Sequence, residues 1–155
     1  MGRTLLLFAW LLLGMVAVPQ TFSEPLEQSI LVLCNRARLQ AGVPPLEWDG
    51  HLALAARGHS RDMAEFDFFD HESPVPQKHD TEARVRQAGG RADLVAENLF
   101  WSSGHGCSTV ASMAVDNWLH SEGHRENLLG REYAHLGVGV FQRGQTFWIT
   151  QVFGP

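Results

Sequence analysis

The stretch HLGVGVFQRGQTFWITQVFG, residues 135–154, decides the fold class of this chain. Apolar residues alternate through 135–142 and again through 146–154, with the period of two that is typical of β-strands. Arg143, Gly144 and Gln145 separate the two runs, and a short connection that contains glycine is typical of a hairpin. The stretch therefore predicts an antiparallel β-hairpin.

The sequence before the hairpin is mostly helical in pattern. Apolar residues recur at helical spacing in four segments, and Asp49 is a good N-cap for the second of them. Gly42 and the pair Pro44-Pro45 end the first segment, and Gly89-Gly90 ends the third. The predicted helices cover 24–41, 49–66, 81–88 and 108–120.

Two stretches between these helices lack a clear period. Residues 67–80 form a Pro-rich segment and predict a loop that carries His71 and His79. The segment AENLFW, residues 96–101, is expected to be irregular and to lead into a Gly- and Ser-rich loop through Gly104. Because helices gather early and strands gather late, the sequence predicts an α+β domain with an antiparallel sheet, not a parallel α/β domain.

The N-terminus has the layout of a secretory signal peptide. Arg3 precedes an apolar run from Leu5 to Val18, which is shorter than the roughly 20 residues that span a bilayer. Thr21 and Ser23 supply small residues at the positions that a signal peptidase reads. We therefore expect a signal peptide at 1–23, a single domain at 24–155, no transmembrane segment in the mature chain, and a secreted or periplasmic protein. An uncleaved membrane anchor is the alternative.

Charge and cysteine content narrow the function classes. Loss of Arg3 reduces the 12 basic residues to 11, which face 17 acidic ones, and this balance argues against nucleic acid as a partner. Two cysteines, Cys34 and Cys107, would be exported into an oxidising compartment. A disulfide between them is a hypothesis that rests on export and on the even count.

A histidine pair in NWLHSEGHRENLLG, residues 117–130, is superficially similar to the zinc-hydrolase signature His-Glu-x-x-His. In this chain, however, Glu122 lies two residues after His120, which turns it roughly 200° around a helix. We expect Gly123 to end the helix before His124, and His120 to face solvent. His59, on the apolar face of its helix, is expected to be a hydrogen-bonded core residue.

Six motifs in order resemble the bacterial branch of the CAP superfamily, named for cysteine-rich secretory proteins, antigen 5 and pathogenesis-related 1 proteins, also called SCP-like domains. They are LCNRARLQAGVPPLEWDGHLALAARGHSRDMA, FFDHESP, AENLFW, NWLHSEGHRENLL, HLGVGV and WITQVFG. The resemblance implies a three-layer α-β-α sandwich with a central antiparallel sheet, which agrees with the α+β class predicted from the pattern.

The resemblance also implies a cavity site. Two histidines and two acidic residues gather there in the family, and some members bind zinc or another divalent cation. The matching positions are His71, Glu97 and His124, whereas Ser121 stands where the second carboxylate is usual. His71, His124 and Glu97 are then the candidate metal ligands, but a serine hydroxyl is a poor zinc ligand. The alternative is a hydrogen-bonded cluster that holds loops together, as Asn98, Arg125 and Asn127 are also expected to do.

Three functions remain open at the level of sequence. The first is a binding module whose cavity holds a lipid, a sterol-like molecule, a peptide, a glycan or another envelope component. The second is a metal-assisted hydrolase of protease type, with Glu97 as general base and His71 and His124 as its partners. The third is an adhesive or structural envelope protein. No nucleophile motif such as Gly-x-Ser-x-Gly occurs, so we assign no catalytic residue and favour binding over catalysis.

Overall fold

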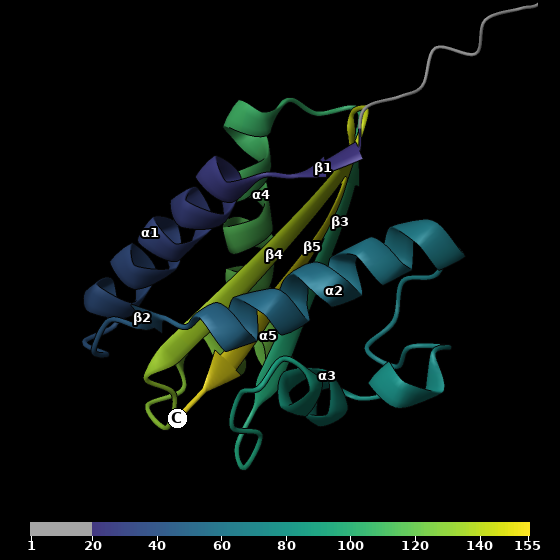
Figure 1. Ribbon diagram of the computed structural model, residues 1–155. Helices are drawn as coiled ribbons and strands as arrows, with labels where there is room; N and C mark the ends of the chain where they lie inside the picture. Colours follow the sequence, from purple (N-terminus) through teal and green to yellow (C-terminus); the bar gives the residue numbers. More distant parts are fainter. Residues whose placement is uncertain (1–19) are drawn as a thin grey trace, which may run out of the picture.

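Figure 1 shows the computed structural model, which describes residues 20–155. The helices are α1 (Glu24–Gln40), α2 (Gly50–Phe66), α3 (Thr81–Gln87), α4 (Cys107–His120) and α5 (Glu122–Leu129), with a short 3-10 turn, η1, at Pro76–Lys78. The strands are β1 (Gln20–Phe22), β2 (Glu47–Trp48), β3 (Ala96–Ser103), β4 (His135–Arg143) and β5 (Thr146–Gly154). The four predicted helices are confirmed to within one residue at each end, and Asp49 caps α2 by accepting from the backbone of His51 and Leu52.

The predicted hairpin forms the centre of the sheet. β4 and β5 pair in antiparallel register from His135 opposite Gly154 to Arg143 opposite Thr146. The strand order is β1-β4-β5-β3, all antiparallel, and the two-residue β2 adds a parallel pairing to the start of β4. The antiparallel α+β class is therefore confirmed.

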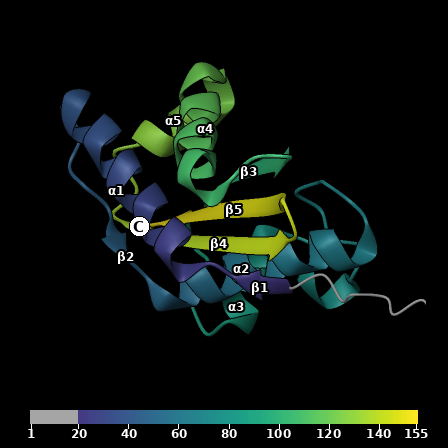
Figure 2. The same cartoon turned by 90° about the horizontal axis from the view of Figure 1, so that it is seen from above.

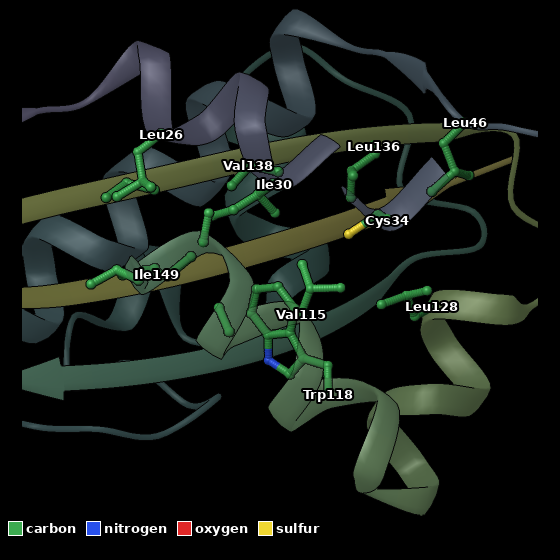
Figure 3. Close-up of a cluster of buried hydrophobic side chains, with 14 of the residues drawn as sticks. Leu26, Ile30, Cys34, Leu46, Val115, Trp118, Leu128, Leu136, Val138 and Ile149 are labelled. Carbon is green, nitrogen blue, oxygen red and sulfur yellow. The ribbon is translucent and has the colours of Figure 1, made fainter. Parts of the chain in front are cut away.

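Helices cover both faces of this sheet. Figure 2 shows α1, α4 and α5 on one side and α2 and α3 on the other, so the expected α-β-α sandwich is confirmed. The larger core lies under α1 and α4 (Figure 3), where Trp118 is fully buried and its indole N–H donates to the Leu99 carbonyl at 2.8 Å. The other labelled members of this core are Leu26, Ile30, Cys34, Leu46, Val115, Leu128, Leu136, Val138 and Ile149.

On the opposite face, α2 lies directly on the backbone of β4. Gly137 and Gly139 face this helix, and a Cβ at either position would overlap the backbone of α2. Ser60 of α2 donates to the Gly139 carbonyl at 2.9 Å, and its hydroxyl also lies 2.8 Å from that of Thr150. Alternate glycines in HLGVGVFQ therefore create the close approach that holds α2 against the sheet.

A buried arginine fixes the end of α5. Arg38 of α1 is 1% exposed, and its guanidinium donates to four backbone carbonyls at 2.7 to 3.1 Å. Burial lowers the pKa of Arg38. Its acceptors are the carbonyls of Pro44, Leu128, Gly130 and Tyr133, so one side chain ties α1 to two loops and to the C-terminal end of α5.

Two expectations about local structure are wrong. The segment AENLFW is the first part of strand β3, not an irregular stretch. Glu97, Asn98 and Leu99 are buried in succession because helices cover both sides of the sheet, so the segment lacks the alternation of a strand with one exposed face. The helix that carries His120 ends before His124, as expected, but Gly123 is not the residue that ends it. The break lies at Ser121, whose backbone is extended (φ −102°, ψ 125°), and α5 begins at the next residue.

The hypothesis of a Cys34–Cys107 disulfide is also wrong, because both cysteines are free. Cys34 is in the α1 core, where its sulfur accepts from Gln151 Nε2 at 3.0 Å. Cys107 is exposed, and its sulfur lies 3.7 Å from Gln142 Oε1. The two thiols therefore lie in different surroundings, one in the core and one at the surface.

The expected signal peptide falls largely outside the described residues, since residues 1–19 are not among them. Its last part is described, because Gln20–Phe22 form β1 and pair with the end of β4. The boundary after Ser23 stays a prediction. Within residues 20–155, no helix combines the length and the apolar character needed to cross a membrane.

Candidate functional site

Glu97 is the centre of the candidate site. It lies on β3 opposite Val152, which packs on the α2 side of the sheet, so its carboxylate faces α2 and α3. Only 7% of the residue is exposed. Arg84 Nη2 donates to Glu97 Oε2 at 2.7 Å, and His71 Nδ1 donates to Glu97 Oε1 at 2.9 Å. Both carboxylate oxygens are therefore engaged by charged or chargeable donors.

Arg84 was not predicted as part of this site. It lies on α3, is 3% exposed, and also donates to the carbonyls of Lys78 and His79 at the end of the loop. A buried carboxylate needs a paired charge, and Arg84 supplies it. The segment TEARVRQ carries no motif that marks this arginine, so only the packing of α3 against β3 reveals the pair.

His59 is the second residue that the motifs did not place in the cluster. It is fully buried on α2, and its Nε2 donates to the Asp70 carbonyl at 2.9 Å, as expected of a hydrogen-bonded core histidine. The same Nε2 lies 3.8 Å from Glu97 Oε1. Burial lowers the pKa of His59, which outweighs the opposing effect of the Glu97 carboxylate. His59 thus fixes the loop that carries His71.

His71 lies in that loop, with about half of its side chain exposed. The hydrogen bond to Glu97 raises the pKa of His71 and outweighs the opposing effect of partial burial. The imidazole is therefore held in one orientation by a carboxylate, while the rest of the ring remains in part open to solvent.

His124 belongs to a different element, α5. It is half-buried, and its Nδ1 has no hydrogen-bond partner among residues 20–155. Burial, followed by the positive charge of His71, lowers the pKa of His124. Asn98 Nδ2 donates to the His124 carbonyl at 3.0 Å, and Asn127 Nδ2 donates to Asn98 Oδ1 at 3.0 Å. These amides attach α5 to β3, as expected of residues that tie loops.

Ser121 and His120 have smaller roles in this geometry. Ser121 is half-buried at the break between α4 and α5, and within the described part of the chain no hydrogen bond joins its side chain to His71, Glu97 or His124. His120 is exposed, as expected, and its Nδ1 bonds the Asp116 carbonyl in its own helix. The two histidines of the stretch 117–130 therefore belong to different helices and different surroundings.

A hollow of about 630 Å³ opens beside this cluster. His124 lines one side of it, and most of its wall is aromatic. Trp101 and Phe69 are about half exposed there, which leaves apolar surface open to solvent. The lining residues are Asp67, Phe68, Phe69, Leu99, Phe100, Trp101, Asn117, His124 and Trp148.

The residues present do not fit a zinc centre of the expected set His71, His124 and Glu97. Glu97 is already bonded on both oxygens, and Ser121 supplies no carboxylate. The donors left over are two imidazoles, fewer than the three protein ligands that catalytic zinc sites use. Among residues 20–155, no three His, Cys, Asp or Glu side chains are arranged to hold a metal ion.

Comparison with known proteins identifies the family. The model of the cysteine-rich secretory protein family, CAP, matches residues 31–153. The uncharacterized membrane protein YlbC of Bacillus subtilis (strain 168) is 39% identical over 122 residues, which are 77% of this chain and 33% of YlbC. The chain therefore spans about a third of the length of that relative.

Solved structures agree with this match. An extracellular protein containing an SCP domain from Bacillus anthracis str. Ames is 35% identical, with a TM-score of 0.70 over 83% of this chain and 40% of that one. An outer surface protein of Borrelia burgdorferi is 18% identical, with a TM-score of 0.74 over 88% of this chain and 97% of that one, a likeness of fold alone. By its motifs, its fold and a match over most of its length, the chain belongs to the CAP family of cysteine-rich secretory proteins.

Proposed function

We propose that this protein is an exported binding module that holds the apolar part of a ligand in the aromatic hollow beside His124. The observation that carries the proposal is the hollow itself, about 630 Å³ in volume, with an aromatic wall left open to solvent. Concave, mostly apolar sites with a few polar groups are typical of small-ligand binding. A lipid, a peptide or a glycan offers the apolar or planar surface that such a wall contacts.

The polar end of the hollow supports a ligand with a polar head. His124 lines the hollow and has a buried Nδ1 atom without a partner among the described residues, and Asn117 and Asp67 lie on the same lining. His71, which Glu97 holds in place and makes easier to protonate, lies near enough to lower the pKa of His124 by its charge. An amphipathic ligand fits this arrangement, with its apolar part on the tryptophans and its head toward the histidines.

The state of Glu97 favours binding over hydrolysis. A general base must be free to accept a proton from the attacking water. Arg84 and His71 already donate to the two carboxylate oxygens of Glu97, so this residue orients His71 and balances a buried arginine. We assign no catalytic residue.

The test is binding by variants that alter the hollow without touching the buried ion pair. Ligand that copurifies with the protein is identified by native mass spectrometry and titrated back by calorimetry, beside a fatty acid, an extended peptide and a chitin fragment. Trp101→Ala and Phe69→Ala should each weaken binding by about tenfold, as expected for loss of a large apolar contact. The control is Phe66→Ala, an exposed aromatic residue of α2 outside the lining. Equal affinity in all variants would reject the hollow as the site.

Export is the second part of the proposal. The apolar run after Arg3 supports it, as do the relatives described as extracellular in B. anthracis and as an outer surface protein in B. burgdorferi. Expression of the full chain in a bacterium, with fractionation and mass spectrometry of the product, measures export directly. Accumulation of the uncut chain in the cytoplasm would contradict it.

A further inference from the structure

A second, smaller hollow lies between α2 and α3, behind the Glu97 cluster. Figure 2 shows α3 beside α2, on the sheet face opposite α1. The hollow has a volume of about 210 Å³ and is rich in basic groups. Its lining comprises Leu54, Ala55, Gly58, His59, Arg61, Lys78, Arg84, Gln87 and Ala88.

Three residues of this lining carry buried polar atoms that lack a hydrogen-bond partner in the described part of the chain. In residues 20–155, five side-chain nitrogens are buried without a hydrogen-bond partner, and three of them belong to residues of this lining: His59 Nδ1, Arg61 Nε and Arg84 Nε. His59 and Arg84 are at least 97% buried. Buried polar atoms are nearly always paired, so such a concentration points to a missing partner.

The chemistry of these atoms restricts that partner. The two guanidinium Nε atoms are hydrogen-bond donors and require acceptor oxygens. His59 is different, because its Nε2 carries the proton that bonds the Asp70 carbonyl. In the neutral imidazole, Nδ1 is then an acceptor and requires a donor. A matching ligand must carry acceptor oxygens, a negative charge and one hydroxyl.

We propose that the hollow between α2 and α3 binds hydrogen phosphate. Its charged oxygens accept from Arg61 and Arg84, and its P–OH group donates to His59 Nδ1. Sulfate and carboxylate anions have the oxygens but no hydroxyl at neutral pH, so they leave His59 unsatisfied. Phosphate monoesters lose their second proton with a pKa of about 6 and are likewise mostly without a P–OH group above neutral pH.

Charges around the hollow set the strength of binding. Lys78 Nζ donates to Asp62 at 2.7 Å and Arg84 is paired with Glu97, so these two cations are already balanced. Arg61 Nε is 3.9 Å from carboxylate oxygens of both Asp62 and Glu65, too far for hydrogen bonds. Arg61 is thus the least compensated cation of the lining, and the affinity for phosphate should be in the millimolar range.

The site is independent of the aromatic hollow, and it adjoins the Glu97 cluster through one residue. Arg84 presents Nη2 to Glu97 while its Nε belongs to the group without partners. Phosphate in the hollow would therefore compete with Glu97 for the positive charge of the Arg84 guanidinium. The NMR resonances of His71, which Glu97 holds, should shift when phosphate binds.

The experiment is titration of the folded protein, labelled with ¹⁵N, with sodium phosphate, sodium sulfate and methyl phosphate at constant ionic strength slightly above neutral pH. We expect saturable shifts in α2 and α3 with phosphate, and binding of sulfate and methyl phosphate weaker by about tenfold, the loss of one hydrogen bond to a buried group. Shifts of equal affinity for sulfate, or for methyl phosphate, would overturn the requirement for a P–OH group. The absence of saturable shifts with phosphate would overturn the site.

Three variants locate the binding. Arg61→Gln, at a side chain 44% exposed, should weaken phosphate binding by about tenfold or more. The matched control is Arg86→Gln, an exposed arginine of α3 that does not line the hollow. Gln87→Lys adds a cation to the lining and should strengthen binding, a gain that loss of folding cannot imitate. Equal phosphate affinity in Arg61→Gln and Arg86→Gln would place the anion elsewhere and reject the proposal.

Discussion

At the scale of single residues, the buried pair of Glu97 and Arg84 governs the candidate site. Both side chains are no more than 3% exposed, and removal of one partner of such a pair typically costs about 3–5 kcal/mol. Substitution of Glu97 would therefore disturb folding as well as ligand contact. His71 and His124 can be changed more safely, because both remain in part exposed to solvent.

The histidines predict a stability maximum near the ordinary histidine pKa of about 6.5. The pKa of His71 is raised by Glu97, so its contribution to stability is complete below about pH 6.5 and is lost as the pH rises through the folded value. The pKa values of His59 and His124 are lowered by burial, so the unfolded chain takes up their protons first and stability falls as the pH drops below about 6.5. Urea unfolding on both sides of this maximum, with chelator present, measures the fall in stability at acid pH and at alkaline pH.

The variant His71→Gln separates these two effects. It should remove most of the fall in stability at alkaline pH, because the group whose pKa is raised is gone. The fall at acid pH should become only slightly smaller, because burial is the larger cause of the lowered pKa of His124 and the charge of His71 the smaller one. If His71→Gln lost stability at alkaline pH as steeply as the unsubstituted protein, another group would have to titrate there.

The two thiols predict a simple chemical result. Cys107 is exposed, whereas Cys34 is buried in the α1 core, where burial raises its pKa to about 12. A thiol reagent added to the folded, unreduced protein should label Cys107 within minutes and Cys34 only after denaturation. Two unreactive cysteines in the denatured, unreduced protein would mean that a disulfide does form.

At the scale of elements, the contact between α2 and β4 depends on two glycines. Gly139→Ala should destabilise the protein by about 3 kcal/mol, because the added methyl group overlaps the backbone at Arg57 and the helix must move away from the sheet. Thermal and urea unfolding measure this loss. The control, Gly58→Ala, lies on α2 with no atom near its new Cβ, and it should stabilise the helix by about 0.5–1 kcal/mol. Similar effects of both substitutions would contradict the packing argument.

The attachment of α5 to β3 also depends on one side chain. Asn98 is fully buried and bonds the His124 carbonyl, Asn127 and Gln151. Asn98→Ala should cost about 2 kcal/mol and speed amide hydrogen exchange in α5, because buried partners are left unpaired. Asn117→Ala, at an exposed asparagine of α4, is the control and should leave exchange in α5 unchanged. Slow exchange in α5 of Asn98→Ala would show that this side chain is not needed to hold the helix.

The elements also show where prediction from sequence succeeds and fails. The helices α1 to α4 were predicted because each buries one face and so carries a regular apolar period. β4 and β5 are buried on both faces, but glycines and polar residues alternate with large apolar residues in their sequence, so the period of two remains visible. β3 was missed because AENLFW has no such alternation, and α5 was missed because Gly123 has the residue type of a helix end while the actual break is at Ser121.

At the scale of the whole molecule, the position at which the signal peptide is cleaved affects the stability of the exported protein. β1 pairs with the end of β4, and Phe22 packs edge-to-face on Phe141 with ring centroids 5.5 Å apart. A chain of residues 24–155 should therefore be less stable than one of residues 20–155 by about 1–2 kcal/mol. Thermal unfolding of the two chains tests this, and equal stability would show that β1 contributes nothing. Mass spectrometry of the exported protein then shows whether cleavage after Ser23 removes the strand.

The sequence by itself determined the α+β class, four of the helices, the hairpin and the family, and through the family motifs it named Glu97 with His71 and His124. These features follow from local period and from short motifs, which are properties of neighbouring residues. Only the tertiary structure decided that Arg84 and His59 adjoin Glu97, that Ser121 makes no bond to the cluster, that Cys34 and Cys107 lie apart, and that two hollows flank the site. Such contacts join residues from separate helices and strands, and they depend on how the layers stack, which no local pattern records.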